Sequence, residues 1–244
     1  MVRVQYRPHQ TRAMKQDIPV VYEDRDLLAV VKPAGILMHR TAAKEKEETL
    51  ADWILENRPK IKNVGDDPRV RPGIVHRLDK DTSGIILIAK NQNTFEYLKS
   101  LFQAGEVQKT YLALVYGNIE PQEGAIDKPI GLKSGSVKRT IHGGKMAKQA
   151  ITEYKVLKNY DGFSLIEARP RTGRTHQIRV HLASINHPIV ADALYAGKKA
   201  KKDSLGLSRQ FLHASSIEFV GPDKTRFRFE AKMPDDLTRA LKSI

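Results

Sequence analysis

The chain contains short apolar runs and short stretches of alternating apolar and polar residues, and both patterns indicate β-strands. In a few other segments apolar residues recur every three or four positions, which indicates helices. Strands are predicted at 19–22, 27–31, 85–89 and 109–116, with hairpins at 152–168 and around 221–224. Helices are predicted at 49–57 and 91–104, over the segment carrying Ile178, Leu182 and Ile185, and from Pro234 to near the C-terminus.

The order of these elements favours an α+β fold. Hairpins are interrupted by single helices, without the strand–helix–strand rhythm of a parallel sheet, so we expect a mixed, mostly antiparallel sheet flanked by helices and loops. No linker between independent domains is apparent, so residues 19–244 are predicted to form a single domain and residues 1–18 a basic arm. Residues 132–149 are rich in Lys, Gly and Ser, and this composition predicts a flexible basic loop.

The charge of the chain narrows the class of partner. Lys and Arg total 42 against 28 Asp and Glu, which gives a net charge of +14. Such an excess favours RNA or DNA as a partner, although a generically basic, solvated surface would give the same count. The basic residues are spread over many segments, which suits a folded surface that follows a phosphate backbone.

Other bulk features exclude several classes. The chain has no cysteine, which excludes disulfides, thiolate nucleophiles and Cys-ligated zinc. Its longest apolar runs are too short to cross a bilayer, and no secretory leader is apparent. We therefore expect a cytoplasmic protein with no membrane association.

One polar loop is a candidate for chemistry. Arg77 and Asp79 lie two positions apart, just before the turn residues 81–84 and the apolar strand at 85–89. An acidic side chain beside a guanidinium at the edge of a buried strand can present an ionised carboxylate to a ligand. The same pair can be a structural salt bridge, and the spacing alone does not distinguish the two.

The full string around this loop is more specific. Residues 75–84, VHRLDKDTSG, resemble the HRLDxxTSG signature of the RluA-type RNA pseudouridine synthases. Residues 109–117, KTYLALVYG, are similar to a strand of that family, and residues 171–182, RTGRTHQIRVHL, to its late motif. Residues 32–39 are similar to its early KPAG segment, and residues 186–195 to the segment after the late motif, except that Ala191 replaces the usual Gly.

The resemblance runs from about residue 19 to the C-terminus. It implies that residues 19–244 are a catalytic domain with the pseudouridine synthase fold. The residues before this domain are too few for the S4-type RNA-binding module that many relatives carry. We therefore expect the catalytic domain alone, which leaves the identity of the RNA open.

The resemblance also implies roles for individual residues. Asp79 matches the catalytic Asp, and Tyr111 matches a Tyr that stacks on the target base and assists proton removal. Arg77 matches an Arg that handles the flipped nucleotide, whereas we expect His76 to be structural. Taken without the resemblance, an aromatic residue in a strand such as Tyr111 is more often part of a core.

A buried catalytic Asp needs a cationic partner to stay ionised, because burial alone raises the pKa of a carboxyl group. The late motif supplies two candidates, and matching on its Ile-Arg-Val portion assigns the role to Arg179. Arg174 is the second choice for the partner of Asp79, and spacing does not decide between Arg174 and Arg179. Arg174 is also predicted to bind the substrate. Arginines on a helix are otherwise most often part of its solvated face.

The predicted function is the isomerisation of uridine to pseudouridine in structured ribosomal or transfer RNA, with base flipping. The resemblance implies no cofactor, no metal and no obligate protein partner, and we expect a monomer. Two alternatives are a non-catalytic RNA-binding or ribosome-assembly protein on the same scaffold, and a Mg²⁺-dependent nuclease. The nuclease is disfavoured because Asp79 and Asp81, among basic residues, make a poor metal cage.

Overall fold

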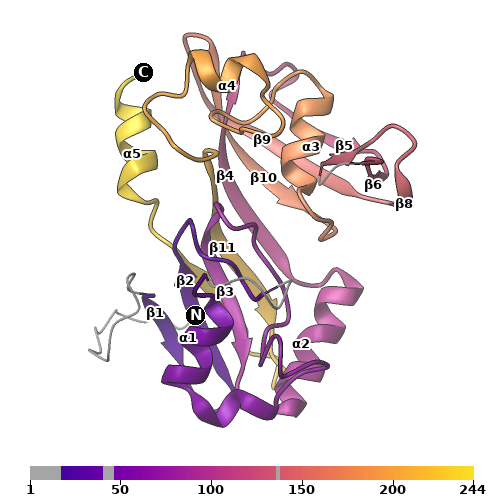
Figure 1. The fold of residues 1–244 in the computed structure, drawn as a ribbon, viewed down its shortest axis with the longest axis vertical. Helices are drawn as coiled ribbons and strands as arrows, with labels where there is room; N and C mark the ends of the chain where they lie inside the picture. Colours follow the sequence, from indigo (N-terminus) through magenta and orange to yellow (C-terminus); the bar gives the residue numbers. More distant parts are fainter. Residues whose placement is uncertain (1–17, 41–46, 136–137) are drawn as a thin grey trace. The chain divides into compact units, whose positions relative to one another are not determined.

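The computed structural model describes residues 18–40, 47–135 and 138–244 of the 244-residue chain. Its helices and mainly antiparallel strands confirm the predicted α+β class (Figure 1). The strands are β1 Val20–Glu23, β2 Leu27–Lys32, β3 Ser83–Ala89, β4 Gln108–Tyr116, β5 Glu123–Asp127, β6 Ile130–Leu132, β7 Arg139–Thr140, β8 Lys145–Lys148, β9 Ile151–Tyr160, β10 Phe163–Pro170, β11 Leu212–Val220 and β12 Arg226–Glu230. The helices are α1 Leu50–Asn57, η1 Pro59–Asn63 (a 3₁₀ helix), α2 Gln92–Ala104, α3 Gln177–Ser184, α4 Lys198–Lys202 and α5 Asp235–Lys242.

The chain divides into two compact units. The first ends at Gln108 and includes Ser216–Ala231, and the second comprises Lys109–Ser215 and Lys232–Ile244. Strand β11 contributes residues to both units. The boundary between arm and domain at residue 19 stays a prediction, because residues 1–17 of the expected arm lie outside the described residues.

The first unit is built on β3. All residues of this strand are buried, and α2 packs on it. Strand β2 pairs with β3 in antiparallel register, so that Leu28 faces Ile88 and Val30 faces Ile86. Strand β1 continues the sheet beyond β2, while β11 neighbours β3 and pairs with β12. The apolar run at 85–89 is continuous rather than alternating because this strand is covered on both faces.

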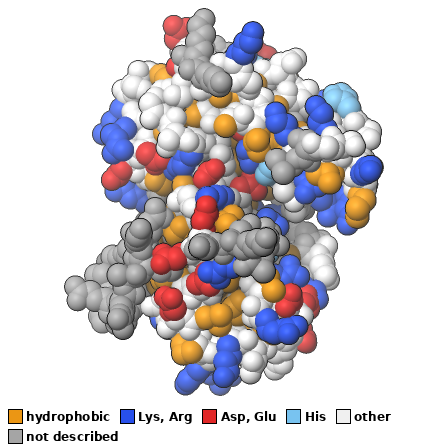
Figure 2. Space-filling model, viewed as in Figure 1, with side chains coloured by type: hydrophobic (Ala, Val, Ile, Leu, Met, Phe, Trp, Pro, Cys, Tyr) orange, Lys and Arg blue, Asp and Glu red, His pale blue; other side chains and the backbone are white. Residues whose placement is uncertain are grey.

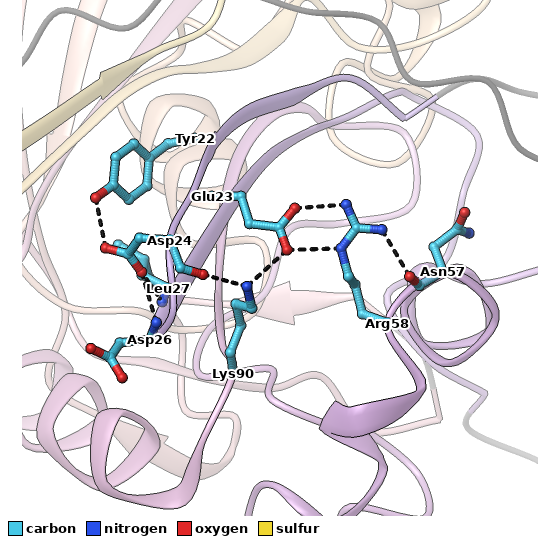
Figure 3. A network of polar contacts seen from close by, with 8 residues as sticks. All are labelled: Tyr22, Glu23, Asp24, Asp26, Leu27, Asn57, Arg58 and Lys90. Carbon is cyan, nitrogen blue, oxygen red and sulfur yellow. Dashed lines mark hydrogen bonds and ion pairs between the residues drawn. The ribbon is translucent and has the colours of Figure 1, made fainter.

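Figure 3 shows the polar network that fixes the turn between β1 and β2. Glu23 accepts two bonds from Arg58, at 2.9 and 2.6 Å, and one from Lys90 at 2.8 Å. An Asp24 carboxylate oxygen accepts from the Leu27 amide at 2.7 Å, as expected of an Asp that opens a turn. The network joins the first hairpin to the ends of α1 and β3.

The ends of the helices follow from local side chains. Thr49 caps α1 in a capping box with Asp52, which accepts from the Thr49 amide at 2.9 Å. Asn91 caps α2 through the Thr94 amide, and Gly105 ends it in the left-handed conformation at φ +74°. The predicted helices at 49–57 and 91–104 are confirmed within a residue or two.

The second unit is a sheet in the order β11-β4-β10-β9-β5. Strands β9 and β10 form the predicted hairpin, and β10 pairs antiparallel with β4. Its buried core combines residues of β4 and β10 with Ile178 and Leu182 of α3 and Leu237 of α5. Helix α3 is thereby held against the sheet, which places the late motif.

The prediction of a flexible loop at residues 132–149 is wrong for the residues of this segment that the structure describes. Strands β6, β7 and β8 form a three-stranded antiparallel sheet here, which we call the basic sheet. Ile130 is buried with Ala150 and Val180 of α3, and Ile141 packs against them. A Cβ on Gly131 would lie 2.6 Å from the Gly144 carbonyl oxygen. Gly131 and Gly144 therefore allow the two backbone segments to approach closely, whereas the Gly-rich composition had suggested flexibility.

Candidate active site

The loop that carries Asp79 is fixed through its backbone. Arg77 is exposed, Leu78 is buried and Asp79 is half-buried, so side chains alternate between solvent and core along an extended segment. The Thr82 amide donates to the Asp79 carbonyl at 3.1 Å and closes a tight turn. Asp79 therefore opens a turn whose backbone bond does not involve its carboxylate.

A buried lysine anchors this turn. Lys32, at the end of β2, is completely buried. Its ammonium donates to the carbonyl oxygens of Pro33 at 2.7 Å, Ile36 at 3.0 Å and Lys80 at 2.9 Å. The Gly35 amide, at φ +87°, donates to the same Lys80 oxygen at 3.0 Å. Three carbonyls match the three N–H groups of an ammonium, so the early KPAG segment holds the loop immediately after the candidate catalytic residue.

His76 has a structural place, as expected. Its Nε2 accepts from the Leu87 amide at 2.8 Å, and its ring stacks on Phe102 with centroids 4.7 Å apart. A ring nitrogen that accepts a hydrogen bond is unprotonated, so this imidazole is neutral in the structure. It ties the Asp79 loop to β3 and α2.

The second unit carries Tyr111 on β4. Tyr111 lies opposite Ala168 of β10 and is half-buried against the core of this unit. Lys109 precedes it by two residues and therefore shares its face of the strand. The Lys109 ammonium donates to the Thr172 carbonyl at 3.4 Å, and burial lowers the pKa of Lys109 to about 8. A poorly solvated cation thus neighbours the candidate stacking residue.

Replacing Lys109 by Met is expected to raise the melting temperature at pH 7, because Met removes the desolvation cost of the ammonium. In the unfolded chain this lysine titrates near its usual 10.5, and in the folded protein near 8. Between these values the unfolded state binds more protons, so wild-type stability rises with pH and the advantage of Met shrinks. Thermal unfolding at pH 7.0 and 9.5 measures both effects.

Lys145→Met, the same change on an exposed lysine of β8, is the control. The difference in melting temperature between this control variant and wild type should be the same at pH 7.0 and at pH 9.5. A Lys109→Met protein that is less stable than wild type at pH 7 would contradict the prediction.

The loop before α3 is organised by Gln177. Its side-chain oxygen accepts from the Thr172 hydroxyl at 2.7 Å and from the Arg174 amide at 2.9 Å. Its side-chain nitrogen donates to the Ile151 carbonyl at 2.9 Å and to the Thr152 hydroxyl oxygen at 3.0 Å. Every position of a buried amide is used, and the turn at 171–176 is thereby fixed to β9.

Arg174 projects from this loop and is exposed, with Nε donating to the Gln149 carbonyl at 3.1 Å. Its accessible guanidinium suits the substrate-binding role predicted for it. Its alternative role, as the partner of Asp79, stays a prediction.

Arg179 is buried, contrary to what is usual for an arginine on a helix. Its Nε and Nη2 donate to the two carboxylate oxygens of Asp192 at 2.7 and 2.9 Å, and Asp192 is completely buried. The amides of Leu194 and Tyr195 also donate to Asp192, at 3.0 and 3.2 Å. The Tyr195 ring lies 5.3 Å from the guanidinium carbon, within the range of a cation–π contact.

The structure thus places the predicted residues in two groups. Arg77 and Asp79 share one loop of the first unit, while Tyr111, Arg174 and Arg179 belong to the second. A guanidinium has five N–H donors, more than the two given to Asp192, so the pairing of Arg179 with Asp79 stays a prediction. Sequence reasoning missed Asp192 as an ion-pair partner, and the only available signal was its place in the segment after the late motif.

Two surveys concern the described residues only. Among them, no three His, Asp or Glu side chains gather in a group that could hold a metal ion. No helix in this part of the chain has the length and apolarity needed to cross a membrane.

Comparisons with known proteins agree with this architecture. The family model of the RNA pseudouridylate synthases matches residues 26–184. Ribosomal large subunit pseudouridine synthase D of Zymomonas mobilis is 38% identical over 238 residues, covering 94% of this chain and 74% of the relative. The protein of that name from Yersinia pestis is 36% identical over 244 residues, covering 94% and 72%.

A solved structure indicates the same family. Human RNA pseudouridylate synthase domain containing 1 superposes with a TM-score of 0.70 at 28% identity, covering 93% of this chain and 86% of that one. The span matched by the family model, residues 26–184, includes the Asp79 loop, Tyr111 and the late motif. The chain therefore belongs to the RNA pseudouridine synthases, a family of isomerases.

Proposed function

We propose that this protein converts uridine to pseudouridine in large-subunit ribosomal RNA. The observation that carries the choice of RNA is the match, over 94% of the chain, to relatives named ribosomal large subunit pseudouridine synthase D. Transfer RNA, the other substrate considered from the sequence, is the comparison substrate.

The basic sheet supports an RNA-binding role for the second unit. Residues 129–150 contain five Lys or Arg residues and no Asp or Glu. Figure 2 shows Lys and Arg side chains gathered where Figure 1 places β6 and β8. We propose that this sheet and the exposed lysines Lys198 and Lys199 at the start of α4 contact the phosphate backbone.

The proposed reaction begins when the target uridine leaves the base stack, which costs a few kcal/mol. Arg77 fills the gap in the stack and Tyr111 packs on the flipped base. Asp79 acts on the nucleoside as nucleophile or base, and Arg179 holds it ionised and oriented. The N1–C1′ bond breaks, C5 bonds to C1′, the C5 proton leaves and N1 gains a proton.

Release of tritium from [5-³H]uridine-labelled RNA tests this function, because the C5 hydrogen is lost only when the C–C bond forms. We expect release from a large-subunit ribosomal RNA transcript, at one or a few uridines mapped by carbodiimide modification and primer extension. Release from bulk transfer RNA transcripts should stay at background. The reverse preference would contradict the proposed substrate, and no release by a protein that binds RNA would favour the non-catalytic alternative.

A further inference from the structure

Tyr195 joins the basic sheet to the late motif. Its hydroxyl oxygen accepts from the Arg139 amide, at the start of β7, at 2.8 Å. The same hydroxyl lies 2.9 Å from Nδ1 of His176, and the ring lies over Arg179. The side chain also packs against the small core formed by Ile130, Ala150 and Val180. One residue therefore contacts the backbone of the basic sheet and the guanidinium of Arg179.

Arg139, the residue held by this bond, has unused donor capacity. It is partly buried, and its Nε is buried with no hydrogen-bond acceptor among the described residues. No ion pair is found for it within the described part of the chain, and residues 129–150 contain no carboxylate. A buried guanidinium donor without an acceptor is costly. Nε itself is shielded from solvent, so an acceptor from outside the chain would meet this partly buried guanidinium at its terminal nitrogens.

The chemistry of that acceptor follows from the guanidinium. Its planar fork matches the paired oxygens of a phosphate or carboxylate, and charge-assisted bonds of this kind are among the strongest in proteins. Leu132 of β6 pairs with Arg139 on one side and with Lys145 on the other, and Lys138 precedes Arg139 in the chain. Several cations on one small sheet favour a polyanionic ligand. A phosphodiester of the RNA chain fits both conditions.

We propose that Arg139 binds a backbone phosphate of the RNA substrate and that Tyr195 is the positioning residue that holds Arg139 for this contact. The proposal rests on the proposed function only in taking RNA as the ligand. It adds a phosphate subsite, connected through Tyr195 to the helix that carries Arg179.

The test is a double-mutant cycle on RNA affinity, measured by filter binding of the 244-residue chain to a large-subunit ribosomal RNA transcript at several KCl concentrations. Arg139→Gln keeps the backbone amide that bonds to Tyr195 but removes the charge. We expect about a tenfold loss of affinity. The slope of log affinity against log salt should fall by about 0.7 for one phosphate on a single strand.

Tyr195→Phe removes the hydroxyl and keeps the ring on Arg179. We expect about a fivefold loss of affinity in the wild-type background, as for one hydrogen bond. In the Arg139→Gln background it should cause no further loss, because Tyr195 then has no contact to position. Arg226→Gln and Tyr97→Phe are the matched controls, since both residues lie in the first unit, Arg226 is exposed, and the hydroxyl of the partly buried Tyr97 also makes one hydrogen bond to the backbone.

The outcomes are distinct. An unchanged salt slope in Arg139→Gln would overturn the phosphate contact. Additive losses in the double variant would overturn the positioning role of Tyr195 and point to its bond with His176. If wild type releases no tritium while Arg139→Gln still lowers the slope, the proposed reaction fails and the phosphate subsite stands.

Discussion

Asp79→Asn is expected to abolish tritium release from labelled RNA, lowering the rate by at least about 10⁴-fold, the upper end for a positioned proton-transfer group. The amide cannot act as a base and is a poor nucleophile, yet it has nearly the shape of the carboxylate. Because the turn at Asp79 is closed by its backbone carbonyl, the loop should keep its conformation. Single-turnover release at saturating RNA measures the effect, and the melting temperature and RNA affinity should change little.

Asp81→Asn, two residues along the same loop, is the matched control and should keep most of the activity. It separates loss of the specific carboxylate from loss of negative charge near the RNA. Full activity in Asp79→Asn would remove Asp79 from the reaction, whatever the family resemblance implies.

Asp192→Asn should reduce the free energy of unfolding by about 3–5 kcal/mol, the usual cost of leaving one member of a buried ion pair without its partner. Arg179 is 5% exposed and Asp192 is fully buried, so water cannot replace the lost carboxylate. Urea denaturation compares the variant with wild type. Asp235→Asn, at an exposed position in the first turn of α5, should change stability by less than about 0.5 kcal/mol.

The double variant Arg179→Met/Asp192→Leu separates stability from catalysis. Apolar replacement of both charges should restore much of the stability, as replaced buried ion pairs often do. If Arg179 keeps Asp79 ionised, the double variant stays inactive although it is folded. A folded and active double variant would show that Arg179 serves only Asp192, and would leave Arg174 as the candidate partner of Asp79.

Elements with a strong period were predictable from the sequence. Helix α2 has an apolar face with a capping Asn91 and a terminal Gly105. Strand β4 carries six consecutive apolar residues, Tyr111 to Tyr116, and the last four are buried. Local rules and tertiary packing agree at both elements. The basic sheet was missed because β7 and β8 are only two and four residues long. The apolar contact of the basic sheet with α3 is made by Ile130 of β6 and by Ile141, which follows β7. This contact joins distant segments of the chain, and no local pattern encodes it.

The candidate site shows the same division. Asp79, Tyr111 and Arg179 could be named because each stands within a recognisable string of residues. Asp192 lies thirteen residues from Arg179, and nothing in that spacing predicts that they meet. Lys32 could be placed in the KPAG segment, but its burial against three carbonyls depends on how that segment folds over the Asp79 loop.

The three carbonyls gathered by Lys32 also bear on how the enzyme uses its affinity for RNA. Residues 33–36 and Lys80 are ordered when the chain folds, so the conformational entropy of this part of the loop is lost at folding and not at binding. A preorganised loop needs no further ordering from the substrate. The favourable interactions made with the nucleic acid can then offset the free-energy cost of unstacking the target nucleotide.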